Sequence, residues 1–412
     1  MRSLLEKAQN RELKITILGM GYIGLPTSIA FARAGFNVNG FDVNEEVIKT
    51  LKSGHIHIVE PSLQEAFVET LNSGKLKPVD MLEKSDVFII SVPTPFKKDH
   101  ETKIADLSYV QSAAKEVAKV LEKNNLVILE STVPPMTTKM MTDILEKESG
   151  ISRDQFMSVH CPERVLPGRI LYELEHNDRI IGSERRDAAE YTKIIYDAMV
   201  KEGTCYITDD ITAEMCKLVE NTFRDVNIAF ANELSVICDK LGIDVFELIK
   251  LANKHPRVNI LTPGAGVGGH CLAVDPWFIV ERFPKEANVI REARLINDYK
   301  PRFIVNKVDE ILKADKSLTI GILGLAYKPN IDDLRESPAM EIAEILRDKG
   351  YKVIACEPNV SKKEVHEFEL YSLGDILEKS DYLVLAQGHD IFKENVDILK
   401  SKRIYDCLGL LK

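Results

Sequence analysis

The chain has 412 residues, 45% of them hydrophobic, and carries a net charge of −10. This length suits two or three globular domains, and the acidic balance argues against a nucleic-acid-binding protein, which usually presents a basic face. Seven cysteines without a C-x-x-C pair do not form a disulfide framework and favour the cytoplasm. The N-terminus is too charged for a signal peptide, and no apolar run reaches the roughly 18 residues of a membrane span, so we expect no membrane association.

The first half of the chain has the pattern of a doubly covered parallel sheet. Residues 1–13 are expected to form a short polar extension with helical character. A strand over 13–18, a helix over 26–35 and a strand over 36–42 then predict a βαβ unit. A helix over 108–122 lies between later strands, as in a parallel sheet with helices on its faces. These later predicted strands are 87–92, 126–130, 156–160 and 179–182.

A long helix is predicted next. Thr212 is a suitable N-cap, helical periodicity continues to Leu241, and Gly242 is the expected stop. A helix of about 29 residues exceeds the usual globular range. We expect it to be a spine between domains and part of a subunit interface.

A second strand, turn and helix begin at 318–325, and strands over 352–355 and 382–385 follow. Ala326-Tyr327-Lys328 stands where a full dinucleotide fingerprint has its last glycine, so this second Rossmann-like domain is predicted not to bind a dinucleotide. The fold class is therefore α/β, with an N-terminal Rossmann domain, a central helical domain and a C-terminal Rossmann-like domain. The predicted limits are 1–13 for the extension and 14–207, 208–305 and 306–412 for the domains.

The first turn carries a dinucleotide fingerprint, Gly19-x-Gly21-x-x-Gly24, between a predicted strand and helix. Its glycines allow a tight turn, close approach of pyrophosphate and close helix packing. Asp42 closes the next strand and can accept hydrogen bonds from a ribose 2′-hydroxyl, which favours NAD over NADP. Thr94 and Thr132 follow later strands at the ligand-binding edge. They are candidates to touch the cofactor or, equally, turn hydroxyls before proline.

Cys271 follows paired glycines and precedes Asp275 by four residues. This context favours a reactive thiol, although a buried small hydrophobe is the commonest fate of a cysteine. A thiol nucleophile together with a hydride acceptor suggests oxidation of an alcohol to an acid through a covalent thioester. Two His-Cys pairs, at 160–161 and 270–271, lack the spacing of a zinc site, so no metal is predicted.

Polar residues on the long helix form a second candidate group. Lys217, Asn221 and Arg224 share one helix face, where a solvated polar stripe is the alternative. Asparagine is a poor helix former, which favours a ligand role for Asn221. Arg257, in a loop before the cysteine motif, suits bidentate binding of a phosphate, or is a surface arginine.

With these motifs in place, the chain resembles the UDP-glucose/GDP-mannose dehydrogenase family over nearly its whole length. Besides the fingerprint and the Lys217/Asn221 helix, the motifs that carry the resemblance are 161–168 (CPERVLPG), 254–259 (KHPRVN), 268–276 (GGHCLAVDP) and 332–337 (DDLRES). Within the family they are most similar to those of the members that oxidise UDP-N-acetyl-D-mannosamine. UDP-glucose enzymes usually have serine and lysine where this chain has His270 and Val274.

The resemblance implies a role for each matching residue. Cys271 would be the nucleophile, Lys217 the acid/base or oxyanion-stabilising group, and Asp275 and Glu163 would position or activate water. Asn221 and Thr132 would support that site. The residues implied to bind NAD are Gly19, Gly21, Tyr22, Ile23, Gly24, Asp42, Thr94, Thr132 and Arg335. Those implied to bind the sugar nucleotide are Arg164, Val165, Lys217, Asn221, Arg224, His255, Arg257, Gly268, Tyr327 and Lys328.

The family also implies an NAD-dependent, four-electron oxidation at C6 of a UDP-sugar in an interdomain cleft. It further implies a homodimer formed through the central domain. The expected reaction converts UDP-N-acetyl-D-mannosamine to its uronate, a precursor of a surface polysaccharide or glycan. UDP-N-acetylglucosamine and UDP-glucose are alternative substrates. There are also two alternatives with a different function. One is a two-electron hydroxy-acid dehydrogenase in which Cys271 is structural, and the other is a non-catalytic NAD-binding protein.

Overall fold

The structure, a computed structural model, describes residues 4–97, 103–166, 168–361 and 364–412. Residues 1–3 of the expected N-terminal extension and Pro167 of the 161–168 motif therefore lie outside the described residues. The chain forms two compact units, Met1–Val219 and Glu220–Lys412. Each unit contains its own sheet with helices packed against it, which confirms the predicted α/β class.

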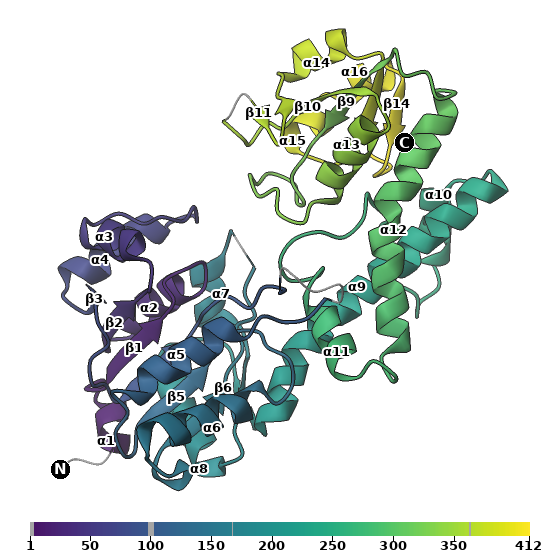
Figure 1. Ribbon diagram of the computed structural model, residues 1–412. Coiled ribbons are helices and arrows are strands. Elements are labelled where there is room, and N and C mark those ends of the chain that lie inside the picture. The colour runs from purple at the N-terminus through teal and green to yellow at the C-terminus, as the bar shows by residue number, and fades with distance from the viewer. Residues whose placement is uncertain (1–3, 98–102, 167, 362–363) are drawn as a thin grey trace. The chain divides into compact units, whose positions relative to one another are not determined.

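Among the described residues, the sheet of the first unit has eight strands (Figure 1). In order across the sheet they are β3 (Leu76–Val79), β2 (Asn37–Phe41), β1 (Lys14–Leu18), β4 (Val87–Ile90), β5 (Leu126–Leu129), β6 (Met157–His160), β7 (Arg179–Gly182) and β8 (Cys205–Thr208). Neighbours pair in parallel except β6 and β7, which pair antiparallel at His160 and Gly182. The strands predicted over 156–160 and 179–182 do extend the sheet, and β3 and β8 form its edges.

Helices cover both faces of this sheet because its strands are apolar on both sides. In β4, Val87 and Ile89 belong to one core cluster, whereas Phe88 and Ile90 belong to the other. The first cluster takes residues from α1, α2, α3, α4, α7 and α8, and the second from α5 and α6. The helices of this unit are α1 (Leu4–Gln9), α2 (Gly24–Arg33), α3 (Glu45–Lys52), α4 (Leu63–Asn72), α5 (Ser108–Ala118), α6 (Thr137–Ser149), α7 (Ile170–His176) and α8 (Arg186–Asp197), with a 3-10 turn at Arg153–Gln155.

The long predicted helix is α9 (Asp210–Leu241), 32 residues long, and the division between the two units falls within it. Its end is as predicted, with Gly242 in the left-handed region at φ 67°. The N-cap predicted at Thr212 is wrong. The helix begins three residues earlier than predicted, at Asp210, because Asp209 caps it, accepting hydrogen bonds from the Thr212 amide at 2.8 Å and hydroxyl at 2.6 Å.

The sheet of the second unit is parallel, with the order β10-β9-β13-β14. Its strands are β9 (Thr319–Leu323), β10 (Lys352–Cys356), β13 (Tyr382–Leu385) and β14 (Ile404–Asp406), beside a small hairpin of β11 (Glu364–Val365) and β12 (Phe368–Glu369). Helices α12 and α13 contribute to one core cluster of this sheet and α14, α15 and α16 to the other. The remaining helices of this unit are α10 (Val245–Ala252), α11 (Asp275–Arg282), α12 (Asn288–Ile311), α13 (Pro338–Asp348), α14 (Leu373–Lys379), α15 (Asp390–Glu394) and α16 (Val396–Lys400).

The segment that carries Cys271 joins α10 to α11 without a helix or strand of its own. Buried amides hold it in place: the Gly264 amide donates to the Oδ1 of Asn232, whose Nδ2 donates to Asn297 of α12. The Asn253 side chain likewise exchanges two hydrogen bonds with the backbone of Ile260. None of the described helices combines the length and the apolar composition that a bilayer crossing requires.

Candidate active site

The turn between β1 and α2 leaves room for a ligand. A Cβ at Gly24 would lie 1.8 Å from the carbonyl oxygen of Gly19, so only glycine fits where α2 begins. Around the Cβ position of Gly21, no described atom lies within 4 Å. No described side chain caps the N-terminus of α2 at Ile23, and the neighbouring Tyr22 is exposed. Open space beside uncapped N–H groups suits the pyrophosphate of a dinucleotide.

Asp42, at the carboxyl end of β2, faces the same turn. Its Oδ2 accepts a hydrogen bond from the Met20 amide and its Oδ1 one from the Asn44 amide, each at 2.8 Å. A carboxylate oxygen has two lone pairs, so the half-buried Asp42 can hold the turn and still accept a ribose hydroxyl. The residues of this edge therefore fit NAD.

The two predicted threonine loops meet at this edge of the sheet. The Thr94 hydroxyl donates to the Thr132 carbonyl oxygen at 2.7 Å, and the Ser131 hydroxyl donates to the Val92 carbonyl oxygen at 2.7 Å. Ser91, at the end of β4, lies so close to Gly19 that a Cβ there would be 2.4 Å from the Ser91 carbonyl oxygen. Both loops thus lie at the carboxyl edge that carries the glycine turn, where an open parallel sheet binds its ligand.

Glu163, which follows β6, is held in a buried ion pair. Its Oε2 accepts from Arg179 Nη1 at 2.7 Å, and both side chains are less than a tenth exposed. Its Oε1 accepts from the Arg164 amide at 2.6 Å. Burial raises the pKa of Glu130, at the end of β5, to about 8, and the charge of Glu163 acts in the same direction. Beside this group, Arg164 donates to the Asp178 carbonyl oxygen and Val165 packs on the core.

Helix α9 carries Lys217 and Asn221 one turn apart, followed by Arg224. Lys217 is half-buried, Asn221 is buried and Arg224 is exposed. Because Asn221 is only 8% exposed, this face is not a solvated polar stripe throughout. The division between the units places Lys217 in the first and the other two residues in the second.

Cys271 is exposed, so it is not a small buried core residue. Its carbonyl oxygen accepts hydrogen bonds from the amides of Val274 and Asp275, at 3.1 and 2.8 Å, in a turn that leads into α11. Asp275, the first residue of α11, is buried, and its Oδ2 accepts from Asn221 Nδ2 at 2.5 Å. Two predicted site residues from distant parts of the chain are thus bonded to each other, and one of them is hydrogen-bonded through its amide to the backbone of Cys271.

The glycines before Cys271 pack against the loop after β9. A Cβ at Gly269 would lie 2.6 Å from the ring of Tyr327, and one at Gly268 would lie 2.4 Å from the Glu336 carbonyl oxygen. Only glycine allows the two loops to approach so closely. Further along the same loop, Lys328 and Arg335 are exposed, and the Arg335 guanidinium donates to both carboxylate oxygens of Asp333 at 2.8 and 2.7 Å.

The remaining predicted ligand residues are more scattered. His255 and Arg257 are exposed in the segment after α10, where the Arg257 amide donates to His255 Nδ1 at 3.4 Å. The described hydrogen bonds and ion pairs do not join either residue, Arg224 or Lys328 to Cys271. The binding roles of these four residues, like the roles of the other site residues, remain predictions.

A Rossmann unit with an open glycine turn, and a second unit that presents an exposed cysteine beside a buried carboxylate, define an NAD-dependent dehydrogenase. The chain belongs to the UDP-glucose/GDP-mannose dehydrogenase family. The family's NAD binding domain matches residues 13–200, its central domain 211–299 and its UDP binding domain 321–412.

Individual relatives match over nearly the whole chain. A UDP-N-acetyl-D-mannosamine dehydrogenase of Campylobacter jejuni is 46% identical over 97% of this chain and 100% of the relative. An NDP-N-acetyl-D-galactosaminuronic acid dehydrogenase of Ralstonia nicotianae is 44% identical over 96% of each. The solved structure of a UDP-D-ManNAc dehydrogenase from Pyrococcus horikoshii superposes with a TM-score of 0.90 at 42% identity, covering 97% of this chain and 96% of that one.

Two pairs of buried residues were not singled out by the sequence. The first is Glu130 and Arg179, which surround Glu163, and the second is Glu357 and His389, which bond to each other in the second unit. The available signal was position, since Glu130 is the last residue of one predicted strand, 126–130, and Glu357 lies two residues after another, 352–355. Their partners lie 32 or more residues away, and sequence spacing does not reveal them.

Proposed function

We propose that this protein oxidises the C6 alcohol of a UDP-sugar to a carboxylate in two NAD-dependent steps, through a thiohemiacetal and a thioester on Cys271. The preferred substrate in this proposal is UDP-N-acetyl-D-mannosamine. The exposed Cys271, hydrogen-bonded through its carbonyl oxygen to the amide of the buried, Asn221-bonded Asp275, is the observation that carries the mechanism. The names of two relatives and the match to a UDP binding domain support the substrate class.

NAD, when bound at the glycine turn, supplies the hydride acceptor for each oxidation. The aldehyde formed first has no carbinol hydrogen to give up until a nucleophile adds to it. Addition of the Cys271 thiolate to the carbonyl carbon forms a C–S bond and gives a thiohemiacetal. The hydrogen on its carbon can then leave as the second hydride. After the second oxidation, water attacks the thioester, the C–S bond breaks, and the acid and the thiol are released.

The other residues are proposed to handle protons and charge. Lys217 removes the hydroxyl proton and stabilises each oxyanion as charge develops. Asp275 and Glu163 orient water for hydrolysis, and Asn221 and Thr132 support them. The buried ion pair with Arg179 keeps Glu163 fixed, which suits a role in orienting water.

Cys271→Ser tests the covalent step. The variant is expected to perform the first oxidation but to stall before acid release, so NADH formed per sugar falls from two to at most one. NADH absorbance and mass spectrometry of the sugar nucleotide measure this ratio. Cys238→Ala, which alters a buried thiol in α9, is the matched control and should keep two NADH per sugar. A Cys271→Ser enzyme that still forms two NADH at a near-native rate would disprove the thioester.

A substrate panel tests the choice of sugar. It comprises UDP-N-acetyl-D-mannosamine, UDP-N-acetylglucosamine, UDP-glucose and an N-acetylgalactosamine nucleotide, the last because of the name of the Ralstonia relative. We expect the highest kcat/KM for UDP-N-acetyl-D-mannosamine. A higher value for any other sugar would replace the substrate while leaving the reaction class intact.

The same proposal covers domain limits, assembly and compartment. We keep the limits 1–13, 14–207, 208–305 and 306–412. Exposed Phe223 and Phe230 on α9 and Leu295 and Tyr299 on α12 support a homodimer through the central helices. None of the seven cysteines, all within the described residues, forms a disulfide, which supports a reducing, cytoplasmic location.

A further inference from the structure

Each unit ends the second strand of its βαβ unit with an acid that bonds to the preceding glycine turn. In the first unit Asp42 accepts from the Met20 amide, one residue after Gly19. In the second unit Glu357 follows β10, and its Oε2 accepts from the amides of Leu325 and Ala326, just after Gly324, at 2.7 and 2.9 Å. Asp42 is half-buried, whereas Glu357 is 4% exposed.

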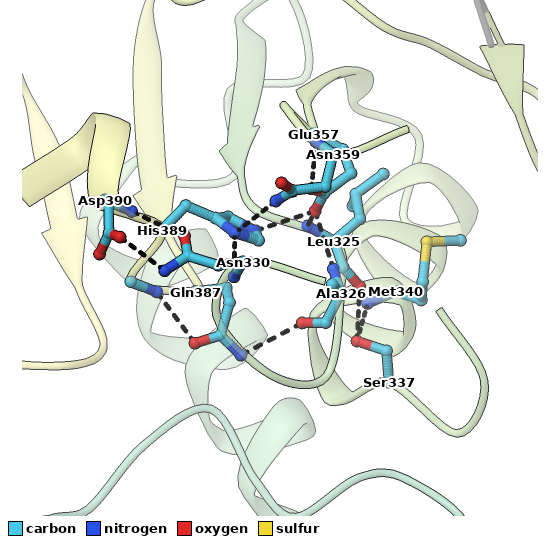
Figure 2. A network of polar contacts seen from close by, with 11 residues as sticks. Leu325, Ala326, Asn330, Ser337, Met340, Glu357, Asn359, Gln387, His389 and Asp390 are labelled. Atoms are coloured by element: carbon cyan, nitrogen blue, oxygen red, sulfur yellow. Dashed lines mark hydrogen bonds and ion pairs between the residues drawn. The ribbon is translucent and has the colours of Figure 1, made fainter. Parts of the chain in front are cut away.

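Glu357 differs from Asp42 in having a buried side-chain partner. His389, 1% exposed and just before α15, lies with its Nε2 3.1 Å from Glu357 Oε2 (Figure 2). Burial alone acts to raise the pKa of Glu357, but the hydrogen bonds from His389 and the two amides outweigh it and hold the pKa below its usual value. The Glu357 carboxylate is thus occupied by the protein itself and is not open to a ribose hydroxyl.

The hydrogen bonds also assign the tautomer of His389. The Asn330 amide donates to His389 Nδ1 at 2.9 Å, so Nδ1 carries no proton. Nε2 is therefore the protonated nitrogen and donates to Glu357. The ring bridges the acid at the end of β10 to Asn330, a residue held in the left-handed region at φ 60°.

Further contacts tie the same loop, residues 324–337, to the segment around His389. The Asn330 and Asp390 residues exchange two hydrogen bonds, at 2.8 and 3.0 Å, and Gln387 Nε2 donates to the Ala326 carbonyl oxygen at 3.2 Å. At the far end of the loop, the Ser337 hydroxyl donates to the Leu325 carbonyl oxygen at 2.6 Å. In Figure 2, Glu357 and Asn359 reach the loop from the end of β10, and Gln387, His389 and Asp390 reach it from the segment after β13.

This loop carries Tyr327, whose ring packs on Gly269, two residues before Cys271. It also carries Lys328, one of the residues predicted to bind the sugar nucleotide. A change in the loop's position would therefore change both a predicted substrate contact and the segment that presents the nucleophile.

We propose that Glu357 and His389 are positioning residues that fix the 324–337 loop for the UDP-sugar and, through Tyr327, support the segment that carries Cys271. The proposal rests on the proposed function of this site. It gives a physical reason for the prediction that the second unit binds no dinucleotide. The acid binds the loop backbone and His389 instead.

Two substitutions of His389 separate positioning from simple folding. His389 Nδ1 also lies 3.0 Å from Asn359 Nδ2. His389→Phe fills the space without any of the ring's hydrogen bonds, whereas His389→Asn can keep an acceptor near the Nδ1 position for the Asn330 amide. With the hydrogen bonds of the ring to Asn330, Glu357 and Asn359 lost, we expect His389→Phe to raise KM for the UDP-sugar and the Kd for UDP about tenfold. His389→Asn should stay within about threefold of the native values, since one bond survives. KM for NAD should rise less than KM for the UDP-sugar in both, because the NAD turn belongs to the first unit and Arg335 is the one predicted NAD contact on this loop.

Tyr351→Phe is the matched control. It removes a 2.6 Å hydrogen bond from Tyr351 to Asp309 at the other end of β10, away from the loop. Calorimetry with UDP alone, steady-state kinetics, and the rate at which iodoacetamide alkylates Cys271 are the measurements. The control should match the native enzyme in all three, and His389→Phe should change the alkylation rate.

The outcomes distinguish the two proposals. If the native protein neither binds UDP nor forms NADH from any UDP-sugar, the proposed function fails. If the native protein does both, but His389→Phe folds and keeps its UDP affinity, sugar KM and alkylation rate, the positioning role is wrong. An equal rise of the sugar KM in the Phe, Asn and Tyr351→Phe variants would indicate a general loss of stability and would also overturn the role.

Discussion

Glu130 lies buried at the carboxyl end of β5, directly before the loop that holds Thr132. Its carboxylate accepts weak hydrogen bonds from the Thr27 hydroxyl, at 3.3 and 3.4 Å, while Arg179 forms its close ion pair with Glu163. Burial raises the pKa of Glu130 to about 8, and the charge of Glu163 adds to the effect. The fold thus favours a protonated Glu130 beside the ion pair of Glu163 and Arg179.

Glu130→Gln is predicted to stabilise the protein at alkaline pH and not at acidic pH. A carboxyl whose pKa is raised by folding contributes most to stability below its unfolded value, 4.5, and this contribution is lost as the pH rises towards 8. Glutamine mimics the protonated form at every pH. At pH 9 the variant should exceed the native protein by about 2 kcal/mol, and at pH 5 the two should be similar.

Thermal unfolding midpoints at the two pH values measure this difference. Glu190→Gln is the control, because Glu190 is exposed on α8 and forms an ion pair with Arg186 four residues before it. A stability difference between Glu130→Gln and the native protein that is the same at pH 5 and pH 9 would contradict the buried, protonated carboxyl.

At the scale of single residues, the sequence indicated which residues belong to the candidate site, but not which of them bond to each other. Asn221 and Asp275 were both expected in the site because of their motifs, but their 2.5 Å hydrogen bond joins positions 54 residues apart and no spacing rule predicts it. Cys271 was left open between a reactive thiol and a core residue, and only its exposure distinguishes the two.

Helix α9 illustrates the scale of the element. Its periodicity and the stop at Gly242 predicted the helix and its end, because both depend on residues within the helix. Its start was less predictable, because Asp209 and Thr212 are both residue types that cap helices. Asp209 is the N-cap and accepts a hydrogen bond from the Thr212 amide. The buried polar anchors of the helix were not predicted. Glu214 accepts from the amides of Met136 and Thr138 in the first unit, and Asp225 pairs with Arg294 of α12 in the second.

Asp225→Asn is predicted to destabilise the second unit. Asp225 Oδ1 accepts from Arg294 Nη1 at 2.6 Å and from Asn297 Nδ2 at 2.8 Å, and the two charged side chains are at most 1% exposed. Removing the Asp225 charge leaves the buried Arg294 guanidinium paired with the more exposed Asp298, which costs about 3 kcal/mol, or a thermal midpoint about 6 °C lower. Differential scanning calorimetry measures the midpoint.

Glu190→Gln again provides the control, since an exposed pair four residues apart on a helix contributes below about 1 kcal/mol. Arg294 keeps an ion pair with Asp298 in the variant, so the loss should not reach complete unfolding at 25 °C. A midpoint that moves no more than that of the control would show that the buried pair adds nothing to stability.

At the scale of the whole molecule, the same strand–turn–acid arrangement occurs twice with different outcomes. The sequence predicted the repetition from hydrophobic strands followed by glycine. That the second unit binds no dinucleotide, because other residues replace the last glycine, stays a prediction. The sequence did not predict that Glu357 would bind the loop backbone and His389. His389 lies 32 residues further along the chain, after a different strand. The predicted domain limits stay predictions, since the described units divide within α9 and the family's three domains match separate stretches.

Because Asp42 is open to a ligand and Glu357 is not, we predict that a change at Asp42 weakens NAD binding without weakening UDP binding. Asp42→Asn should raise the Kd for NAD about tenfold, because the variant loses the charge that best accepts the ribose hydroxyl. The Kd for UDP should stay within about twofold, since Tyr327 and Lys328 lie in the other unit. Asparagine keeps an oxygen that can accept from the Met20 or Asn44 amide, so the turn should persist, and circular dichroism checks the fold. Calorimetric titrations with NAD and UDP separately give the two constants. Parallel losses of both affinities in a folded variant would mean that Asp42 acts through the whole molecule and not at the cofactor.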